Sequence, residues 1–289
     1  MPQQGSPQAT QAQPPRAVPT GIIQVVHLDA VKHAWEISPG IIVHGYGYNE
    51  QVPGPTLEAS VGDTLFVRFT NSLLEPTSIC WHGPGSTAEI DRTEHAAAAV
   101  QPGGTLEYQL ELTDAGTFWY HAVIDDRPQS ASGLYGALLV RDPAEPGFDS
   151  EQVLVFGDST LIVLNGSTVL TPVPERGGHR EEHMLLNGVL EPQILLTAGH
   201  RERWRLVNAT ATRLRLSLSG HRMTVIGTLG TPLSAPVEVD EVALGPGECR
   251  DLVAGPFTAD QRLVLRALSV NGRGTSIQRR VATLHVAGP

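Results

Sequence analysis

The sequence holds 289 residues, of which 40% are hydrophobic and only 5% aromatic, and its formal charge is −10. This length is enough for two hydrophobic cores, and an acidic chain without a basic stripe or arm is a poor partner for nucleic acid and for anionic membranes. Thirty glycines and 22 prolines favour short strands joined by turns over long helices. We therefore expect no nucleic-acid partner and no membrane partner.

Period-two alternation dominates the chain after its first 19 residues. Residues 1–19 are rich in Gln, Pro, Ala and Ser without apolar periodicity, which predicts a disordered tail. The stretches "DTLFVRFTN" (63–71), "TLEYQLELT" (105–113) and "TRLRLSLSG" (212–220) then alternate apolar and polar residues, as strands with one buried face do. The apolar positions expected to share a face within each stretch are Leu65, Val67 and Phe69; Leu106, Tyr108, Leu110 and Leu112; and Leu214, Leu216 and Leu218.

Pro-Gly and Gly-Asp pairs recur between these apolar runs, a pattern typical of antiparallel Greek-key β-sandwiches. In "RDPAEPGFDSEQ" (141–152), two prolines, a glycine and several charges separate two strongly apolar strands. We therefore predict an all-β protein whose first sandwich covers 20–143 and whose second covers 152–289, joined by a linker over 144–151.

Two stretches carry residues that can bind a metal. On a strand, residues i and i+2 project to the same side about 7 Å apart, so an H-x-H pair can serve one ion. In "TSICWHGPG" this pair is Cys80 and His82, and in "GTFWYHAVIDD" it is His121 and Val123, of which valine cannot bind a metal. Because imidazoles on neighbouring strands can converge, His82 and His121 are the first candidates for copper, zinc, iron or nickel.

A third ligand could come from several sources. The thiolate of Cys80 would favour Cu(I) or zinc, a carboxylate could come from Asp91 or Asp125, and another subunit could also supply it. In the opposing interpretation, Cys80 is a small buried apolar residue. Both histidines are then relics that bind no metal and pack beside three aromatic residues, Trp81, Trp119 and Tyr120.

Several of these stretches together resemble the multicopper oxidases, the family of laccases and ascorbate oxidase. The similarity to the first cupredoxin domain lies in "YNEQVPGPTLEASVGDTLFVRFTNSLLEPTSICWHGPG", "QPGGTLEYQLELTDAGTFWYHAV" and "GLYGALLVRDP". The similarity to a second domain lies in "LLNGVLEPQILLTAGHRERWRLVNAT" and "VALGPGECRDLVAG". This resemblance covers roughly residues 43 to 255 and implies two cupredoxin-like Greek-key sandwiches.

The resemblance also assigns roles around a trinuclear copper cluster. His82 matches the second histidine of the family's H-W-H-G motif, and His121 matches the first histidine of its W-Y-H-S-H motif; these two positions share one copper. Cys80 and Val123 replace ligands of the other two coppers. His95 falls in a loop that lies near the cluster in the family, which makes it an accessory candidate.

The resemblance therefore implies a reduced number of coppers. The family's H-C-H motif, which carries the type 1 copper, has no counterpart in the sequence, so a conventional laccase is not expected.

The first hypothesis is a multicopper-oxidase-like protein with one copper and redox chemistry on a small molecule. If it is an enzyme, it is a copper-dependent oxidoreductase. The alternative is a copper-free binding or scaffold protein, and the third is zinc-assisted hydrolysis, for which no acid or base is evident. Catalytic residues stay unassigned.

Two further expectations concern the oligomeric state and the cellular compartment. Two-domain relatives form trimers, which favours a homo-oligomer. The first 21 residues lack the basic start and apolar run of a secretory signal, so a native N-terminus predicts a cytoplasmic protein; removal of a signal would make it secreted or periplasmic. Cys80 and Cys249 fall in different predicted domains, so no disulfide is expected between them. Cys249, in the turn-like "PGECRD", is expected to be partly exposed.

Overall fold

Nearly all regular structure in the protein is β-strand. The computed structural model describes residues 21–83, 99–123, 129–145, 147–164, 167–171, 181–228, 230–270 and 276–288. Within these ranges the one helical element is a 3₁₀ turn, η1 (Gln129–Ser132). None of the described residues form a helix long and apolar enough to cross a membrane. The expected all-β fold is confirmed.

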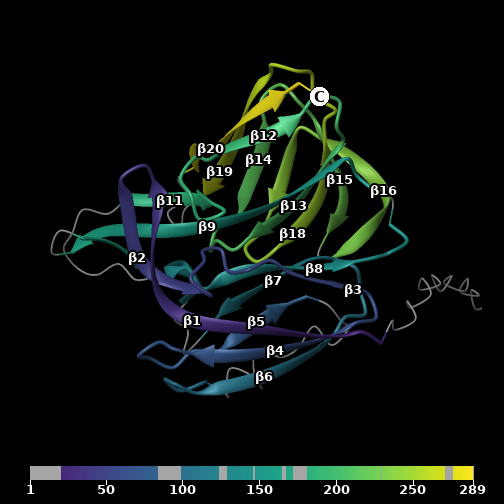
Figure 1. The fold of residues 1–289 in the computed structure, drawn as a ribbon. Helices are drawn as coiled ribbons and strands as arrows, with labels where there is room; N and C mark the ends of the chain where they lie inside the picture. Colours follow the sequence, from purple (N-terminus) through teal and green to yellow (C-terminus); the bar gives the residue numbers. More distant parts are fainter. Residues whose placement is uncertain are drawn as a thin grey trace, which may run out of the picture.

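The first sandwich occupies the lower part of Figure 1, coloured purple to teal. One of its sheets runs in the order β2-β1-β4-β6, with bounds Ile41–Tyr48, Ile23–Ser38, Thr64–Asn71 and Thr105–Glu111. The facing sheet runs β3-β8-β7-β5, with bounds Leu57–Ser60, Tyr135–Arg141, Gly116–Ala122 and Ile79–His82. Most strand pairs are antiparallel, and β1–β4 and β3–β8 are parallel.

The alternating pattern of β4 explains why it faces the core of this sandwich. Leu65, Val67 and Phe69 are fully buried, whereas Arg68 between them is exposed and pairs with Glu107 of β6. Because successive side chains point to opposite faces, one run of apolar residues at every second position is enough to orient the strand. The predicted face is confirmed here, and Tyr108, Leu110 and Leu112 join the same core.

The second sandwich forms the upper, green to yellow part of Figure 1. One sheet contains β16-β15-β18-β13-β9-β10, with β11 also paired to β9; the bounds are Thr231–Val239, Met223–Thr228, Cys249–Ala254, Glu202–Asn208, Ser150–Leu164, Ser167–Thr171 and Glu181–Leu186. The facing sheet runs β12-β20-β19-β14-β17, with bounds Gln193–Thr197, Ser276–Ala287, Arg262–Val270, Leu214–Leu218 and Glu241–Leu244. The predicted face of Leu214, Leu216 and Leu218 lies in its core, as expected.

A hairpin of the first sandwich reaches the second and joins their sheets. Strand β2 pairs in parallel with β10, with Thr168 opposite Val43, so one sheet of eleven strands runs through both sandwiches. Beside this junction, the Trp35 indole N–H donates to the Gly188 carbonyl at 3.0 Å, and the Leu190 amide donates to the Ile37 carbonyl at 2.7 Å. The hairpin is therefore fixed by backbone pairing as well as by packing.

Strands β7 and β13 meet at the centre of the contact between the sandwiches, and β13 is buried on both faces. Trp204 and Leu206 of β13 enter the second core, whereas Arg203, Arg205 and Val207 face the first sandwich. A small apolar cluster fills part of this contact: Trp119, Tyr135, Ala137, Val155, Val207 and Cys249. The prediction that Cys249 is partly exposed is wrong, because β18 begins at this residue and turns its thiol into the cluster.

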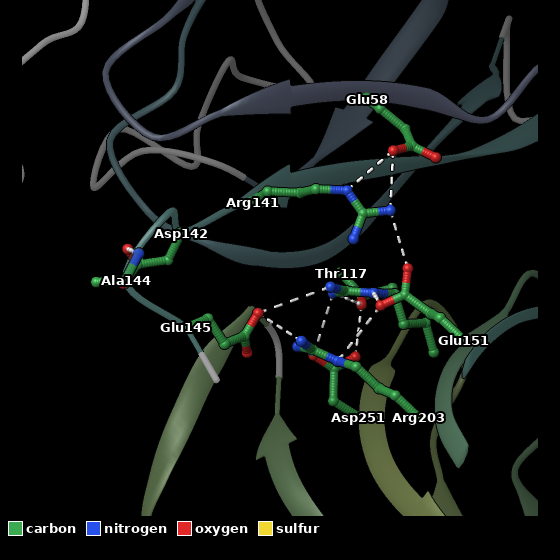
Figure 2. A network of polar contacts seen from close by, with 10 residues as sticks. Glu58, Thr117, Arg141, Asp142, Ala144, Glu145, Glu151, Arg203 and Asp251 are labelled. Atoms are coloured by element: carbon green, nitrogen blue, oxygen red, sulfur yellow. Dashed lines mark hydrogen bonds and ion pairs between the residues drawn. The ribbon is translucent and has the colours of Figure 1, made fainter. Parts of the chain in front are cut away.

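Beside this cluster lies a network of buried charges, shown in Figure 2. The side chains of Arg203 and Arg205 are only 5% and 1% exposed. Arg203 Nη2 lies 2.7 Å from Asp251 Oδ2, and its Nη1 lies 2.5 Å from Glu145 Oε2. Arg205 Nε donates to Glu151 Oε2 at 2.6 Å. A buried guanidinium needs such carboxylates, because an unpaired charge in the interior is very costly.

The network also binds the first sandwich. Thr117 of β7 donates its hydroxyl to Asp251 Oδ1 at 2.5 Å and accepts a hydrogen bond from Arg205 Nη1 at 3.1 Å. Arg141, at the end of β8, donates to Glu151 Oε1 at 2.9 Å. Each sandwich therefore supplies partners that the other needs.

We predict that Arg205→Ala lowers the free energy of unfolding by about 3–5 kcal/mol, because the substitution leaves buried Asp251 and half-buried Glu151 with one cation fewer. Chemical denaturation followed by circular dichroism measures this change. Arg68→Ala is the matched control, since the Arg68–Glu107 pair is more than half exposed and should cost less than about 1 kcal/mol. Equal effects of the two substitutions would contradict the role assigned to the network.

A second prediction concerns acid stability. Burial alone would raise the pKa of Glu151, but hydrogen bonds from Arg141 and Arg205 outweigh burial and hold that pKa below its ordinary value of 4.5. A carboxyl group with a lowered pKa stabilises the folded state above its unfolded pKa, and this contribution is lost as the pH falls through the folded pKa. Wild type should therefore be more stable than Glu151→Gln at neutral pH, and the difference should shrink below pH 4.5.

Urea unfolding of both proteins, from about pH 7 to about pH 3, tests this dependence. The exposed pair supplies the control: Glu107→Gln should change stability little at any pH. A difference between wild type and Glu151→Gln that stays constant down to the lowest pH would show that the carboxylate contributes nothing as an ion.

Candidate metal centre

The candidate metal ligands lie on two paired strands of the first sandwich. In the antiparallel ladder of β5 and β7, Cys80 lies opposite His121 and His82 lies opposite Trp119. These four residues share one face of the sheet, because each strand alternates. Trp81 and Tyr120, between them in sequence, point the other way into the core. Every residue of β7 is buried except His121, which, like Cys80 and His82, is partly exposed.

The ligand atoms of Cys80, His82 and His121 all lie within 4.8 Å of one another. The two Nε2 atoms of the histidines are 2.8 Å apart, and Cys80 Sγ lies 3.7 Å from His82 Nε2. Nδ1 of His121 lies 3.2 Å from the Ala122 carbonyl oxygen. If Nδ1 carries the proton and donates it there, Nε2 is left as an acceptor, which is the tautomer that a metal needs.

Trp119 holds both imidazoles in place. Its ring centroid lies 4.6 Å from that of His82 and 4.4 Å from that of His121, and both pairs are within 12° of parallel. The indole N–H donates to the Gly247 carbonyl of the second sandwich at 3.0 Å. The position of the histidine rings therefore depends on both sandwiches.

The end of β5 is set by a close approach of its backbone to β7. Gly83 follows His82, and a Cβ atom placed there would lie 2.3 Å from Cδ1 of Phe118. Its φ of +150° is also one that side chains rarely adopt. Only glycine lets the chain pass Phe118 at this point and keep His82 in its register.

The donor set fits a metal ion. Metal–nitrogen bonds of about 2.0–2.1 Å and metal–sulfur bonds of about 2.3 Å put neighbouring ligand atoms about 3.3–3.8 Å apart in tetrahedral or trigonal geometry. The distance from Cys80 to His82 already lies in this range. The two histidine nitrogens would need to separate by only about 0.5 Å, a small rotation of the rings.

The structure brings together the three ligands expected from the sequence: Cys80, His82 and His121. The accessory candidates Asp91, His95 and Asp125 lie outside the described residues. Val123 follows β7, and its amide donates to the Ser78 carbonyl at 3.3 Å. The sequence predicts for Trp119 only packing beside the histidines; its position two residues before His121 is the signal that the two side chains share a face. Trp81 and Tyr120, expected beside the histidines, lie on the opposite face.

Comparison with known proteins identifies the family and supports the fold. Two family models, both described as multicopper oxidase, match residues 31–145 and 119–286. The multicopper oxidase MmcO of Mycobacterium tuberculosis is 34% identical over 246 residues, covering 74% of this chain and 48% of that protein. The cell division protein FtsP of a Rahnella species is 31% identical over 232 residues, covering 76% and 48%. The chain thus spans about half the length of these relatives.

A solved structure of similar fold superposes on most of this chain. The multi-copper oxidase from Pseudomonas thermotolerans superposes with a TM-score of 0.77 and 33% sequence identity, over 93% of this chain and 65% of that one. The cupredoxin-like architecture expected for both sandwiches is therefore confirmed.

Gly83→Ala tests whether the close approach to Phe118 positions the site. The added methyl group would force β5 away from β7, which should lower stability by about 1–3 kcal/mol and weaken binding of any metal to His82. Thermal unfolding and metal titration measure the two effects. Gly147→Ala is the control, because a Cβ there meets nothing within 4 Å and should change stability by less than about 0.5 kcal/mol. A neutral Gly83→Ala would contradict the steric argument.

Proposed function

Because the chain belongs to the multicopper oxidase family, we propose that it binds one copper ion at His82 and His121 and serves in redox chemistry on a small molecule. The observation that carries this proposal is the convergence of both imidazole Nε2 atoms, 2.8 Å apart, on neighbouring strands. The family implies copper, and the replacement of two expected cluster ligands by Cys80 and Val123 supports a smaller number of ions than its oxidases hold.

Each residue has a defined task in this proposal. His82 and His121 would bind the ion through Nε2, and the Ala122 carbonyl would keep Nδ1 of His121 protonated. Trp119 would keep both rings parallel to its own indole, since it stacks on both. A copper ion bound here would supply one-electron redox chemistry.

The partial exposure of the ligands gives a small molecule access. Cys80, His82 and His121 are half-buried, while the rest of β7 is closed on both faces. A substrate could therefore approach the ion from the exposed side without displacing the aromatic residue behind it. Two protein imidazoles leave coordination positions open, as a site that acts on a ligand requires.

Metal content per chain tests the proposal directly. Protein reconstituted with copper, and separately with zinc, then dialysed, should retain about one copper per wild-type chain, and His82→Ala/His121→Ala should retain none. The control is His27→Ala/His44→Ala, which removes two exposed histidines elsewhere and should bind as wild type does. Mass spectrometry of the metal gives the count.

Retention of copper in wild type but not in the site variant would support the redox hypothesis. Retention of zinc alone would instead support the hypothesis of zinc-assisted hydrolysis. No retained metal in any protein would overturn the proposed function and leave a cupredoxin-fold binding or scaffold protein.

A further inference from the structure

We infer that Cys80 is the third ligand of this site and makes it a two-histidine, one-thiolate centre selective for Cu(I). The inference rests on the proposed function, because it requires that His82 and His121 bind a metal. It goes beyond that function by assigning the sulfur ligand and the preferred ion.

The position of Cys80 is the first argument. It lies directly opposite His121 in the β5–β7 ladder and two residues before His82, so all three side chains project from one rigid face. Its Sγ is 3.7 Å from His82 Nε2, the separation expected when both bind one trigonal ion. The three ligand atoms enclose a space that one ion can occupy after a small movement of the rings.

The second cysteine shows what a non-ligand thiol looks like in this protein. Cys249 is 3% exposed and packs against Trp119, Val155 and Val207 in the apolar contact between the sandwiches. Burial, together with the nearby Asp251 carboxylate, raises the pKa of its thiol. Cys249 is therefore a neutral packing residue, whereas Cys80 is partly exposed and lies beside two imidazoles.

Charge balance then favours Cu(I). When the ion binds, the Cys80 S–H bond breaks, its proton leaves to solvent, and a sulfur–copper bond forms; no electron changes hands. Cu(I) with one thiolate and two neutral imidazoles carries no net charge, whereas Cu(II) or Zn(II) in the same site carries a net charge of +1. A half-buried position beside an apolar cluster penalises the charged complexes, and soft thiolate itself prefers Cu(I).

The test compares Cu(I) binding by three versions of the 289-residue chain under anaerobic conditions, in competition with a chromophoric Cu(I) chelator. Wild type should bind one Cu(I), and Cys80→Ser should bind it at least about 100-fold more weakly, because losing a direct ligand should cost no less than losing a residue that only orients a ligand. Cys249→Ala, which removes the other thiol, should match wild type. Thermal unfolding of each protein shows that the variants are folded.

A second measurement needs no variant. Iodoacetamide should alkylate Cys80 in the metal-free protein and not in the Cu(I)-loaded one, while buried Cys249 stays unmodified in both; peptide mass spectrometry locates the label. Cobalt(II) gives a further signature, since a thiolate ligand adds a sulfur-to-cobalt charge-transfer band that Cys80→Ser should lack.

The outcomes separate the inference from the proposed function. Weaker binding by Cys80→Ser together with protection of Cys80 supports the thiolate ligand. Equal Cu(I) affinity of wild type and Cys80→Ser, with Cys80 still alkylated in the loaded protein, overturns the inference while the histidine site stands. No Cu(I) bound by wild type overturns both.

Discussion

The pairing of two buried guanidinium groups with carboxylates between the sandwiches holds the strand that carries His121 against the second sandwich. Arg203 and Arg205 project from β13 toward the first sandwich and are neutralised by Glu145, Glu151 and Asp251. Thr117 joins this network from β7, on the same face as Trp119 and His121. The ion pairs therefore fix how β7 lies over β13, and with it the position of the Trp119 and His121 side chains relative to the second sandwich.

Buried charges of this kind specify geometry better than they add stability. Removing two ions from water costs much of what their attraction returns, so an apolar contact of the same area would hold the sandwiches together as well. An apolar contact would also tolerate small sliding movements. Charged pairs at 2.5–2.7 Å do not, because each carboxylate must stay with its own guanidinium. The candidate metal centre, at which displacements of about half an ångström matter, would benefit from that restriction.

Much of this arrangement could be predicted from sequence, and the exceptions have a common cause. Alternation was enough to orient β4, since Leu65, Val67 and Phe69 carry the whole apolar face of that strand. The two-residue spacing likewise predicted that Cys80 and His82 share a face, and the expectation that imidazoles on neighbouring strands converge added His121 to the site. The sequence could not reveal that Arg205 or Cys249 is buried. Both lie on the outer face of their sandwich, and alternation does not show whether a second domain covers that face.

The sheet that continues from β2 into β10 has a consequence for how ligands would reach the candidate metal centre. In many two-domain proteins a cleft opens when the halves rotate about a flexible connection. Here such a rotation would break the Thr168–Val43 pairing and the hydrogen bonds from Trp35 to Gly188 and from Leu190 to Ile37. The protein is built as one stiff body rather than as a hinge. Access to the proposed site would then depend on the side on which Cys80, His82 and His121 are partly exposed, and not on a movement of one sandwich away from the other.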